Sequence, residues 1–237
     1  MKKIANLNAE NYYAEEGDIW FEKYARKLET QSVYPNVSTL KRAFDFFFSF
    51  LFLLLVASWL FPLISILIKL NSKGPIFFVQ DRIGINGSGF KCYKFRTMRV
   101  DDGRYMYTPI AKGNQSITKI GAFLRKTNLD EMPQFINVLL GDMSIVGPRP
   151  HAIPFHQTYA SFIDFIDFRH LVKPGITGLA QIKGYRGDVT DFEENKMRTI
   201  IRIKYDVQYI RIWSFKLDMI IVWKTALQML GGKTNGH

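Results

Sequence analysis

The chain has 237 residues, enough for one sizeable domain or for one domain with an appendage. Its 32 lysine and arginine residues against 21 aspartate and glutamate residues give a formal net charge of +11, which suits nucleic acid, an anionic membrane surface or a phosphate-bearing substrate. No common nucleic-acid-binding motif is visible, and the single cysteine, Cys92, excludes an intramolecular disulfide. The composition therefore favours a reducing, cytoplasmic setting and a membrane or phosphate partner, with no nucleic acid.

Residues 1–40 are polar and aromatic, and we expect an accessory arm with a short helix over 18–28. The following stretch, 46–68, carries no charge, and as one helix of about 35 Å it could cross a bilayer. Pro62 interrupts this stretch, and basic residues flank it at both ends, which satisfies the positive-inside rule if both ends stay in the cytoplasm. Two alternatives remain open, a spanning anchor and a re-entrant helix that breaks at Pro62 and returns to the same side.

Residues 75–79 and 90–95 are rich in aromatic and apolar side chains, and the turn-forming residues 86–89 separate them. This pattern predicts a β-hairpin. Its basic side chains, which include Lys94 and Arg96, are candidates for contacts with lipid headgroups or with a diphosphate.

Two helices are expected after the hairpin. A loop over 101–117 leads into a short basic helix over 118–126. The second helix should begin between Leu129 and Met132, because Pro133 lacks the N–H that a helix interior needs. Its buried stripe is expected to comprise Phe135, Ile136, Val138, Leu139 and Leu140.

The second helix opens on two adjacent carboxylates, Asp130 and Glu131. An acidic pair at a helix N-terminus is ordinarily a cap, stabilised by free N–H groups and by the helix dipole. Here basic residues stand on both sides, Arg125 just before the pair and Arg149 in the Gly-Pro-Arg-Pro turn that follows. Carboxylates beside basic groups and a helix N-terminus are the groups that Mg²⁺-assisted phosphoryl transfer requires.

The last third of the sequence begins with aromatic residues at helical spacing over 155–168, which core packing explains. A glycine-rich loop over 173–188, with Arg186, could hold a nucleotide or a sugar. Amphipathic helices are expected over 192–210 and 213–230, the second lying at the membrane interface or on the body. No ligand spacing connects the histidines of this part, which we interpret as core or surface residues: His151, His156 and His170.

Several motifs follow one another in this order: KRAFDFFFS, IKLNSKGPIFFVQDRIG, YKFRTM, the segment that runs from LRKTNLDEMPQF to GPRP, KPGITGLAQIKGYRG, YDVQYI and WSFKLD. With them the sequence resembles the monotopic polyprenyl-phosphate phosphoglycosyl transferases, a family of bacterial sugar transferases. The resemblance implies an α+β, membrane-embedded catalytic domain with a re-entrant helix over 41–73, a β-hairpin and interfacial helices. It further implies that a catalytic domain over 74–232 faces the cytoplasm at the bacterial inner membrane, with 1–40 as an arm and 233–237 as a tail.

The resemblance also implies the reaction, which moves a sugar 1-phosphate from a UDP-sugar to undecaprenyl phosphate and releases UMP. It makes Asp130 the nucleophile, with Glu131 as a metal or acid–base partner and Mg²⁺ bridging the carboxylate and the diphosphate. The candidate substrate-binding residues are Arg149, Arg96, Lys94, Arg125, Gln181 and Arg186.

Two other functions are compatible with these residues. One is a glycosyltransferase that moves the sugar alone and releases UDP, and the other is a non-catalytic monotopic scaffold of a glycan-assembly complex. The intact Asp130–Glu131 pair with Arg149 nearby counts against the scaffold, which needs none of them. Membrane lipids and a second copy of the chain complete the candidate partners. The catalytic part is similar to that of the family's larger subfamily, whose multi-helix membrane region has no counterpart in residues 1–40.

Overall fold

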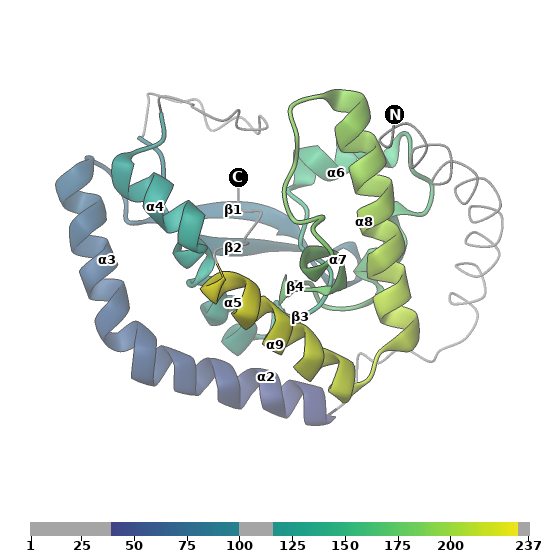
Figure 1. The fold of residues 1–237 in the computed structure, drawn as a ribbon, viewed down its shortest axis with the longest axis horizontal. Coiled ribbons are helices and arrows are strands. Elements are labelled where there is room, and N and C mark those ends of the chain that lie inside the picture. Colours follow the sequence, from purple (N-terminus) through teal and green to yellow (C-terminus); the bar gives the residue numbers. More distant parts are fainter. Residues whose placement is uncertain (1–38, 100–115, 232–237) are drawn as a thin grey trace. The chain divides into compact units, whose positions relative to one another are not determined.

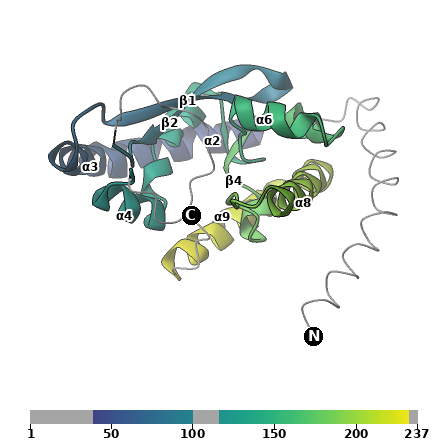
Figure 2. The ribbon, with the colours of Figure 1, turned by 90° about the horizontal axis from the view of Figure 1, so that it is seen from above.

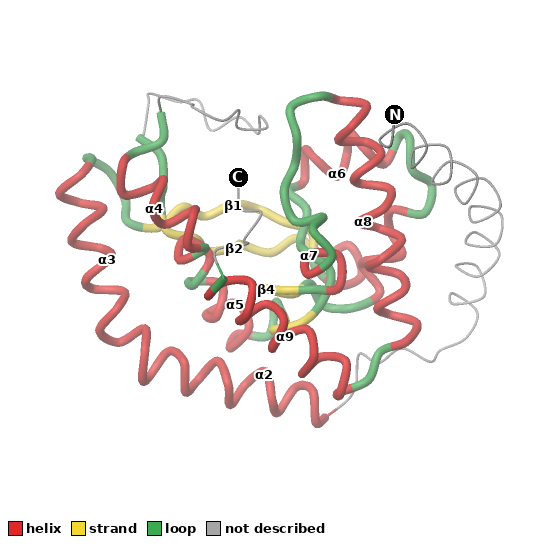
Figure 3. Tube along the Cα trace, viewed as in Figure 1, coloured by secondary structure: helices red, strands yellow, loops and turns green. Residues whose placement is uncertain are grey.

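The computed structural model describes residues 39–99 and 116–231, which fall within one compact unit. Helices combine with two separate two-stranded sheets in this part of the chain, which confirms the predicted α+β class (Figure 3). The predicted arm lies outside the described residues apart from its last two positions, and so do the helix expected over 18–28, most of the 101–117 loop and the tail over 233–237.

The long apolar stretch forms one continuous helical segment, long and apolar enough by length and composition to cross a membrane. It comprises α2 (Thr39–Phe52), the π-helical turn η2 (Leu53–Ala57) and α3 (Ser58–Asn71). The predicted break at Pro62 is wrong, because Pro62 lies inside α3 and the chain remains helical on both sides of it. The helical segment changes direction instead of breaking, because α2 and α3 run in different directions (Figure 1). Two local features accompany this bend: Pro62 has no N–H to donate to the carbonyl of Ser58, and the π-helical turn η2 ends just before Ser58.

This helical segment has one buried stripe and otherwise exposed apolar faces. The stripe that packs on the rest of the unit comprises Asp45, Ser49, Ala57, Ile64 and Ile68. The exposed faces carry Phe47, Phe50, Leu54, Leu55, Trp59, Leu63, Ile66 and Leu70. A contiguous apolar surface of this kind is typical of contact with a membrane or with another protein.

The predicted hairpin is confirmed. Strands β1 (Phe77–Ile83) and β2 (Gly89–Phe95) pair antiparallel, and the short 3₁₀ turn η3 (Ile85–Gly87) connects them. Asn86 and Gly87 have φ angles of 53° and 74°, left-handed values that these two residue types accept more readily than others. The turn residues thus account for the position of the hairpin.

A second sheet, which the sequence did not predict, joins β3 (Ser144–Val146) and β4 (Gly175–Thr177) in parallel. Figure 2 shows β4 between the hairpin and the pair of C-terminal helices. This sheet lies in the main hydrophobic core, whose buried members include Cys92, Val138, Met143, Ile145, Val172, Ile210 and Ile221.

Shorter helices surround the two sheets. The predicted basic helix is confirmed as α4 (Lys119–Thr127), and the hydroxyl of Thr118 caps it by accepting a hydrogen bond from the third residue of the helix. The aromatic stretch after the Gly-Pro-Arg-Pro turn forms α6 (Ile153–Ala160) and a separate 3₁₀ segment, η5 (Ile166–Leu171). The glycine-rich loop contains the four-residue helix α7 (Leu179–Ile182).

Both expected C-terminal helices are present, as α8 (Phe192–Ile212) and α9 (Phe215–Leu230). Helix α9 packs on the core through Ile221, which is fully buried, and leaves Trp223 and Leu227 exposed. It therefore packs on the body with one face and presents an apolar face to its surroundings.

Candidate active site

The acidic pair lies in a turn between two helices. Helix α4 ends at Thr127, and the left-handed conformation of its C-cap residue Asn128 (φ 57°) turns the chain into a separate 3₁₀ turn, η4 (Leu129–Glu131). Helix α5 (Gln134–Leu140) follows, with Pro133 in its N-cap position. The helix start expected within 129–132 is therefore wrong, because the chain forms the 3₁₀ turn first and Pro133 provides no N–H with which to continue it.

The buried stripe expected for α5 is confirmed in part. Val138 is fully buried, and Phe135 packs against the hydrophobic core and stacks on a ring of α2. Ile136 and Leu139 are half-buried. The prediction for Leu140 is wrong: this residue is 66% exposed, because it ends the helix on the side that faces away from the core.

Glu131 is the centre of a cluster of three cations from distant parts of the sequence. Its Oε1 accepts hydrogen bonds from Lys94 Nζ at 2.7 Å and from Arg149 Nη2 at 2.6 Å. Its Oε2 accepts from Arg149 Nη1 at 3.0 Å and from Arg186 Nη2 at 2.6 Å. Although burial favours the neutral acid, these cations hold the pKa of Glu131 well below its usual value. Four donors thus occupy the roughly four lone-pair positions of one ionised carboxylate.

The neighbouring carboxylate of Asp130 is in a different situation. No hydrogen bond or ion pair to another described residue fixes it, and the side chain is half-buried. Burial, together with the negative charge of Glu131, raises the pKa of Asp130 to about 6, even though Lys94 and other nearby cations lower it. Asp130 is therefore predominantly ionised at neutral pH and has lone pairs that a substrate or a metal ion can use.

The position of Arg149 depends on close backbone packing. The Gly-Pro-Arg-Pro turn follows β3 and lies directly on the start of the glycine-rich loop, where Gly175 N donates to Pro148 O at 2.8 Å. A Cβ on Gly147 would lie 2.5 Å from the carbonyl oxygen of Lys173, at the start of the loop, and a Cβ on Gly175 would lie only 2.1 Å from Gly147 N. Only glycine permits this approach, which brings the turn and the loop carrying Arg186 to the same carboxylate.

A second buried arginine supports the turn from behind. Arg169 donates to the backbone carbonyl of Arg149 at 2.6 Å, forms an ion pair with Asp206 at 2.8 Å and contacts the ring of His151. Sequence reasoning missed this group. Asp206 lies in the YDVQYI motif, which was a usable signal, whereas no pattern marked Arg169.

Two of the predicted phosphate-binding arginines have structural partners here. Arg96 donates to the carbonyl of Ser72 at 2.8 Å and also contacts the carbonyl of Lys73, at the C-terminal end of α3. Arg125 Nε donates to the hydroxyl of Thr97 at 2.8 Å. Neither joins the Glu131 cluster by a hydrogen bond between described residues, so their role in phosphate binding stays a prediction.

Gln181 lies in α7 and donates from its amide to the carbonyl of Ile176 at 3.0 Å. Its Oε1 is buried and has no hydrogen-bond partner in the described part of the chain. The predicted contact of Gln181 with the nucleotide or sugar therefore stays a prediction, for which this acceptor is available.

Both ends of the apolar helical segment are attached to the body that carries this site. At its start, Lys41 Nζ forms an ion pair with Asp218 at 2.6 Å, and Arg42 donates to two carbonyls near the end of α5. At its end, Arg96 of β2 binds the carbonyl of Ser72. Asp218, the last residue of the WSFKLD motif, thus holds the start of the apolar helical segment rather than the acidic pair.

Residues 36–232 match the family model described as bacterial sugar transferase, which covers well over half of the chain. The chain belongs to this family. A UDP-glucose:undecaprenyl-phosphate glucose-1-phosphate transferase of Escherichia coli K12 is 45% identical over 189 residues, which are 80% of this chain and 40% of the relative. A UDP-N-acetylgalactosamine-undecaprenyl-phosphate N-acetylgalactosaminephosphotransferase of Aeromonas hydrophila is 41% identical over 71% of this chain and 38% of its own length.

A shorter relative matches almost end to end. The exopolysaccharide production protein PSS of Rhizobium leguminosarum is 43% identical over 196 residues, which are 81% of this chain and 95% of the relative. By contrast, the aligned region spans only about two fifths of the Escherichia coli protein. The region that matches the family model, residues 36–232, contains the acidic pair, the Gly-Pro-Arg-Pro turn and the glycine-rich loop.

Proposed function

We propose that the protein transfers a sugar 1-phosphate from a UDP-sugar to undecaprenyl phosphate, releases UMP and so initiates a lipid-linked surface glycan. The observation that carries this proposal is the contrast within the acidic pair: Asp130 makes no hydrogen bond or ion pair with another described residue, whereas Glu131 binds three cations. A free carboxylate next to fixed positive charge is suited to attack on a phosphate ester. The names of the relatives support the same donor and acceptor.

Two in-line displacements complete the reaction. In the first, an oxygen of the Asp130 carboxylate attacks the phosphorus that bears the sugar, the bond from this phosphorus to the bridging oxygen breaks, and UMP leaves with the electron pair. The product on the enzyme is an acyl phosphate. In the second, a phosphate oxygen of undecaprenyl phosphate attacks the same phosphorus, the bond from this phosphorus to the Asp130 oxygen breaks, and the carboxylate leaves with the electron pair and is restored.

The cations of the Glu131 cluster compensate the negative charge that gathers during both steps. Arg149 and Arg186 each have more N–H donors than Glu131 uses, so they can bind phosphate oxygens while the carboxylate keeps them in place. Lys94 adds a third positive charge on the same carboxylate. Such prearranged donors stabilise a developing charge without reorganising during the reaction.

Mg²⁺ is held in proteins by one or two carboxylates together with substrate phosphates. Asp130 fits this role because no described residue donates a hydrogen bond to its carboxylate, whereas the four hydrogen bonds described above already fill the acceptor positions of Glu131. When bound, Mg²⁺ would neutralise charge on the diphosphate oxygens. We therefore propose that Asp130 binds the metal and that Glu131 holds the cations in place. Of the two predicted metal ligands, Asp130 and Glu131, this proposal keeps only Asp130.

We also infer that the apolar helical segment is re-entrant and that the catalytic body faces the cytoplasm at the inner membrane. Lys41 at one end and Ser72 at the other both bind the same folded body. A spanning helix would place its ends on opposite sides of the bilayer, where one polar body cannot hold both. In a Cys92→Ala background, Thr39→Cys and Lys73→Cys should be labelled from the same side of the membrane by an impermeant maleimide. Labelling from opposite sides would show that the segment spans.

The reaction itself is tested by nucleotide release from the detergent-held protein with Mg²⁺, undecaprenyl phosphate and a panel of UDP-hexoses and UDP-N-acetylated sugars. We expect turnover to UMP with one or a few of these sugars, dependent on the lipid acceptor. Release of UDP would favour the sugar-only glycosyltransferase. Silence with every sugar, from protein shown to be folded, would favour the scaffold.

A further inference from the structure

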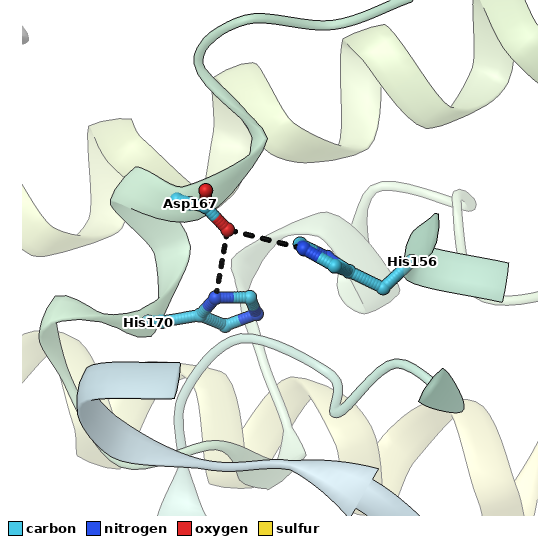
Figure 4. Close-up of side chains that lie close together, drawn as sticks. All are labelled: His156, Asp167 and His170. Carbon is cyan, nitrogen blue, oxygen red and sulfur yellow. Dashed lines mark ion pairs between the residues drawn. The ribbon is translucent and has the colours of Figure 1, made fainter. Parts of the chain in front are cut away.

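Three potential metal ligands meet between α6 and η5, and no step of the proposed transfer uses them. His156 comes from α6, and Asp167 and His170 come from η5 (Figure 4). Oδ1 of Asp167 lies 3.1 Å from Nε2 of His156 and 3.3 Å from Nδ1 of His170. The three side chains each offer one ligand atom, and these atoms all lie within 4.8 Å of one another.

We propose that His156, Asp167 and His170 form a binding site for a divalent transition metal, with zinc as the best-matched ion. Zinc bonds nitrogen and oxygen at about 2.0–2.2 Å in tetrahedral sites, so neighbouring ligand atoms lie about 3.3–3.5 Å apart. The two distances to Asp167 are already close to this spacing. The two imidazole nitrogens lie within 4.8 Å of each other, and rotation of the rings would bring them to this spacing.

The chemistry of the three ligands fits the same ion. Two imidazoles and one carboxylate form a common ligand set for zinc, and three protein ligands leave the fourth position to water. Metal binding requires neutral imidazoles. Burial lowers the pKa of both rings, that of His170 to about 3, so both are neutral at physiological pH.

The surroundings permit the ion to enter and to stay. Asp167 is exposed, whereas the two rings are largely covered, so the site opens to solvent on the carboxylate side. The positive charge of Arg169, next to the site in sequence, is balanced by Asp206. The other ring nitrogens, Nδ1 of His156 and Nε2 of His170, have no hydrogen-bond partner among the described residues. Each ring can therefore adopt the tautomer in which the nitrogen that faces Asp167 is unprotonated and can bind the metal.

The location of the site gives it a structural role. Bound metal would join α6 to η5, and η5 carries Arg169, which donates to the backbone of Arg149. The ion would therefore stabilise the support of the Gly-Pro-Arg-Pro turn without contacting the substrate. The expectation that these histidines are unrelated core or surface residues is thereby revised for His156 and His170, whose proximity no sequence spacing indicated.

The test is a zinc-binding titration on the full chain in detergent, after metal has been removed with EDTA. A chelating indicator competes for the zinc, and excess Mg²⁺ occupies the proposed magnesium site at Asp130. We compare the wild-type protein with His156→Gln and Asp167→Asn. Asp164→Asn is the matched control, because it removes the same charge from an exposed residue three positions earlier. A melting curve without zinc verifies that each variant is folded.

The proposal predicts one zinc per wild-type chain and the same affinity in Asp164→Asn. Affinity should fall at least about 100-fold in both ligand variants, because even partners of metal ligands contribute factors of 10–100. Zinc should also raise the melting temperature of the wild-type protein but not that of Asp167→Asn. Failure of the wild-type chain to bind zinc, or unchanged affinity in His156→Gln, would show a hydrogen-bonded cluster only and would overturn the proposal.

Discussion

Two buried arginine clusters lie back to back across the Gly-Pro-Arg-Pro turn, and their charge balance differs. In front of the turn, one carboxylate, Glu131, is surrounded by three cations whose side chains are 12–14% exposed. Behind it, Arg169 and Asp206 form a matched pair whose side chains are 1% and 2% exposed. The front cluster (Glu131 with Lys94, Arg149 and Arg186) therefore has a surplus of positive charge and some access to solvent. The rear pair (Arg169 with Asp206) has no surplus charge and almost no access to solvent.

This difference separates a binding site from a support. Burying an unmatched cation is costly, so a surplus persists where an anionic ligand is expected to share it. In the matched pair, the charge of Arg169 is balanced by Asp206, and Arg169 fixes backbone geometry through its hydrogen bond to the carbonyl of Arg149. If this division holds, substitutions in front of the turn should reduce turnover more than substitutions behind it.

Replacing the nucleophile should have the largest effect. Asp130→Asn retains the shape of the side chain but removes the attacking charge, so we expect UMP formation to fall by at least about 10⁴-fold. Melting temperature and sedimentation with membranes should be unchanged, because Asp130 makes no hydrogen bond with another described residue. Appreciable turnover in this variant would remove Asp130 from the nucleophile role.

Truncating the front arginine should rank second. Arg149→Ala removes the bidentate donor on Glu131, and we expect kcat/KM to fall by about 10²–10³-fold. Arg149→Lys should recover only part of this loss, since lysine cannot reproduce the planar fork. Lys216→Ala, on the exposed face of α9, is the control and should change the rate less than two-fold. Equal and small losses in Arg149→Ala and Lys216→Ala would make Arg149 a purely structural residue.

Breaking the rear pair should act on stability more than on rate. Asp206→Asn leaves the guanidinium of Arg169 buried without its counter-ion, which typically costs about 3–5 kcal/mol of unfolding free energy. Turnover per folded molecule should fall less than about ten-fold, because the front cluster remains intact. Urea titration followed by tryptophan fluorescence, with activity normalised to the folded fraction, measures both. A rate loss as large as that of Arg149→Ala, without loss of stability, would contradict the division.

An exposed ion pair should show almost no effect. Lys91 and Asp81 are 3.3 Å apart on the hairpin, with side chains 68% and 63% exposed. Surface pairs of this kind contribute little, because water and salt screen them. Lys91→Ala should therefore leave both the melting temperature and the rate within experimental error, and a marked loss of rate would extend the substrate site to this face of the hairpin.

Local sequence signals predicted the elements that depend on local chemistry. Asn86 and Gly87 marked the hairpin turn, the short basic segment over 118–126 corresponds to α4, and the helical periodicity of the last third located α8 and α9. The parallel pairing of Ser144–Val146 with Gly175–Thr177 could not be predicted, because strands of three residues show no periodicity. Pro62 indicated a change of direction but not a break in the helix, since a helix can bend at a proline and continue.

The candidate site was predictable as a set of residues but not as an arrangement. The acidic pair and Arg149 are close in sequence, whereas Arg186 and Lys94 are separated from Glu131 by 55 and 37 positions. Long-range contacts of this kind follow from packing between elements, such as the close approach of Gly147 to Gly175. For the same reason, the sequence did not reveal that all three cations bind Glu131 and that none of them forms a hydrogen bond with Asp130.

The central claim is that Asp130 carries the sugar phosphate between donor and acceptor. The most direct measurement incubates the protein with a UDP-sugar labelled at the sugar-bearing phosphate, without lipid acceptor, and counts the label that stays covalently bound. The account predicts up to one label and one UMP per chain, loss of the bound label when undecaprenyl phosphate is added, and no label in Asp130→Asn. Equal labelling of the wild-type protein and Asp130→Asn, or turnover without any bound label, would contradict it.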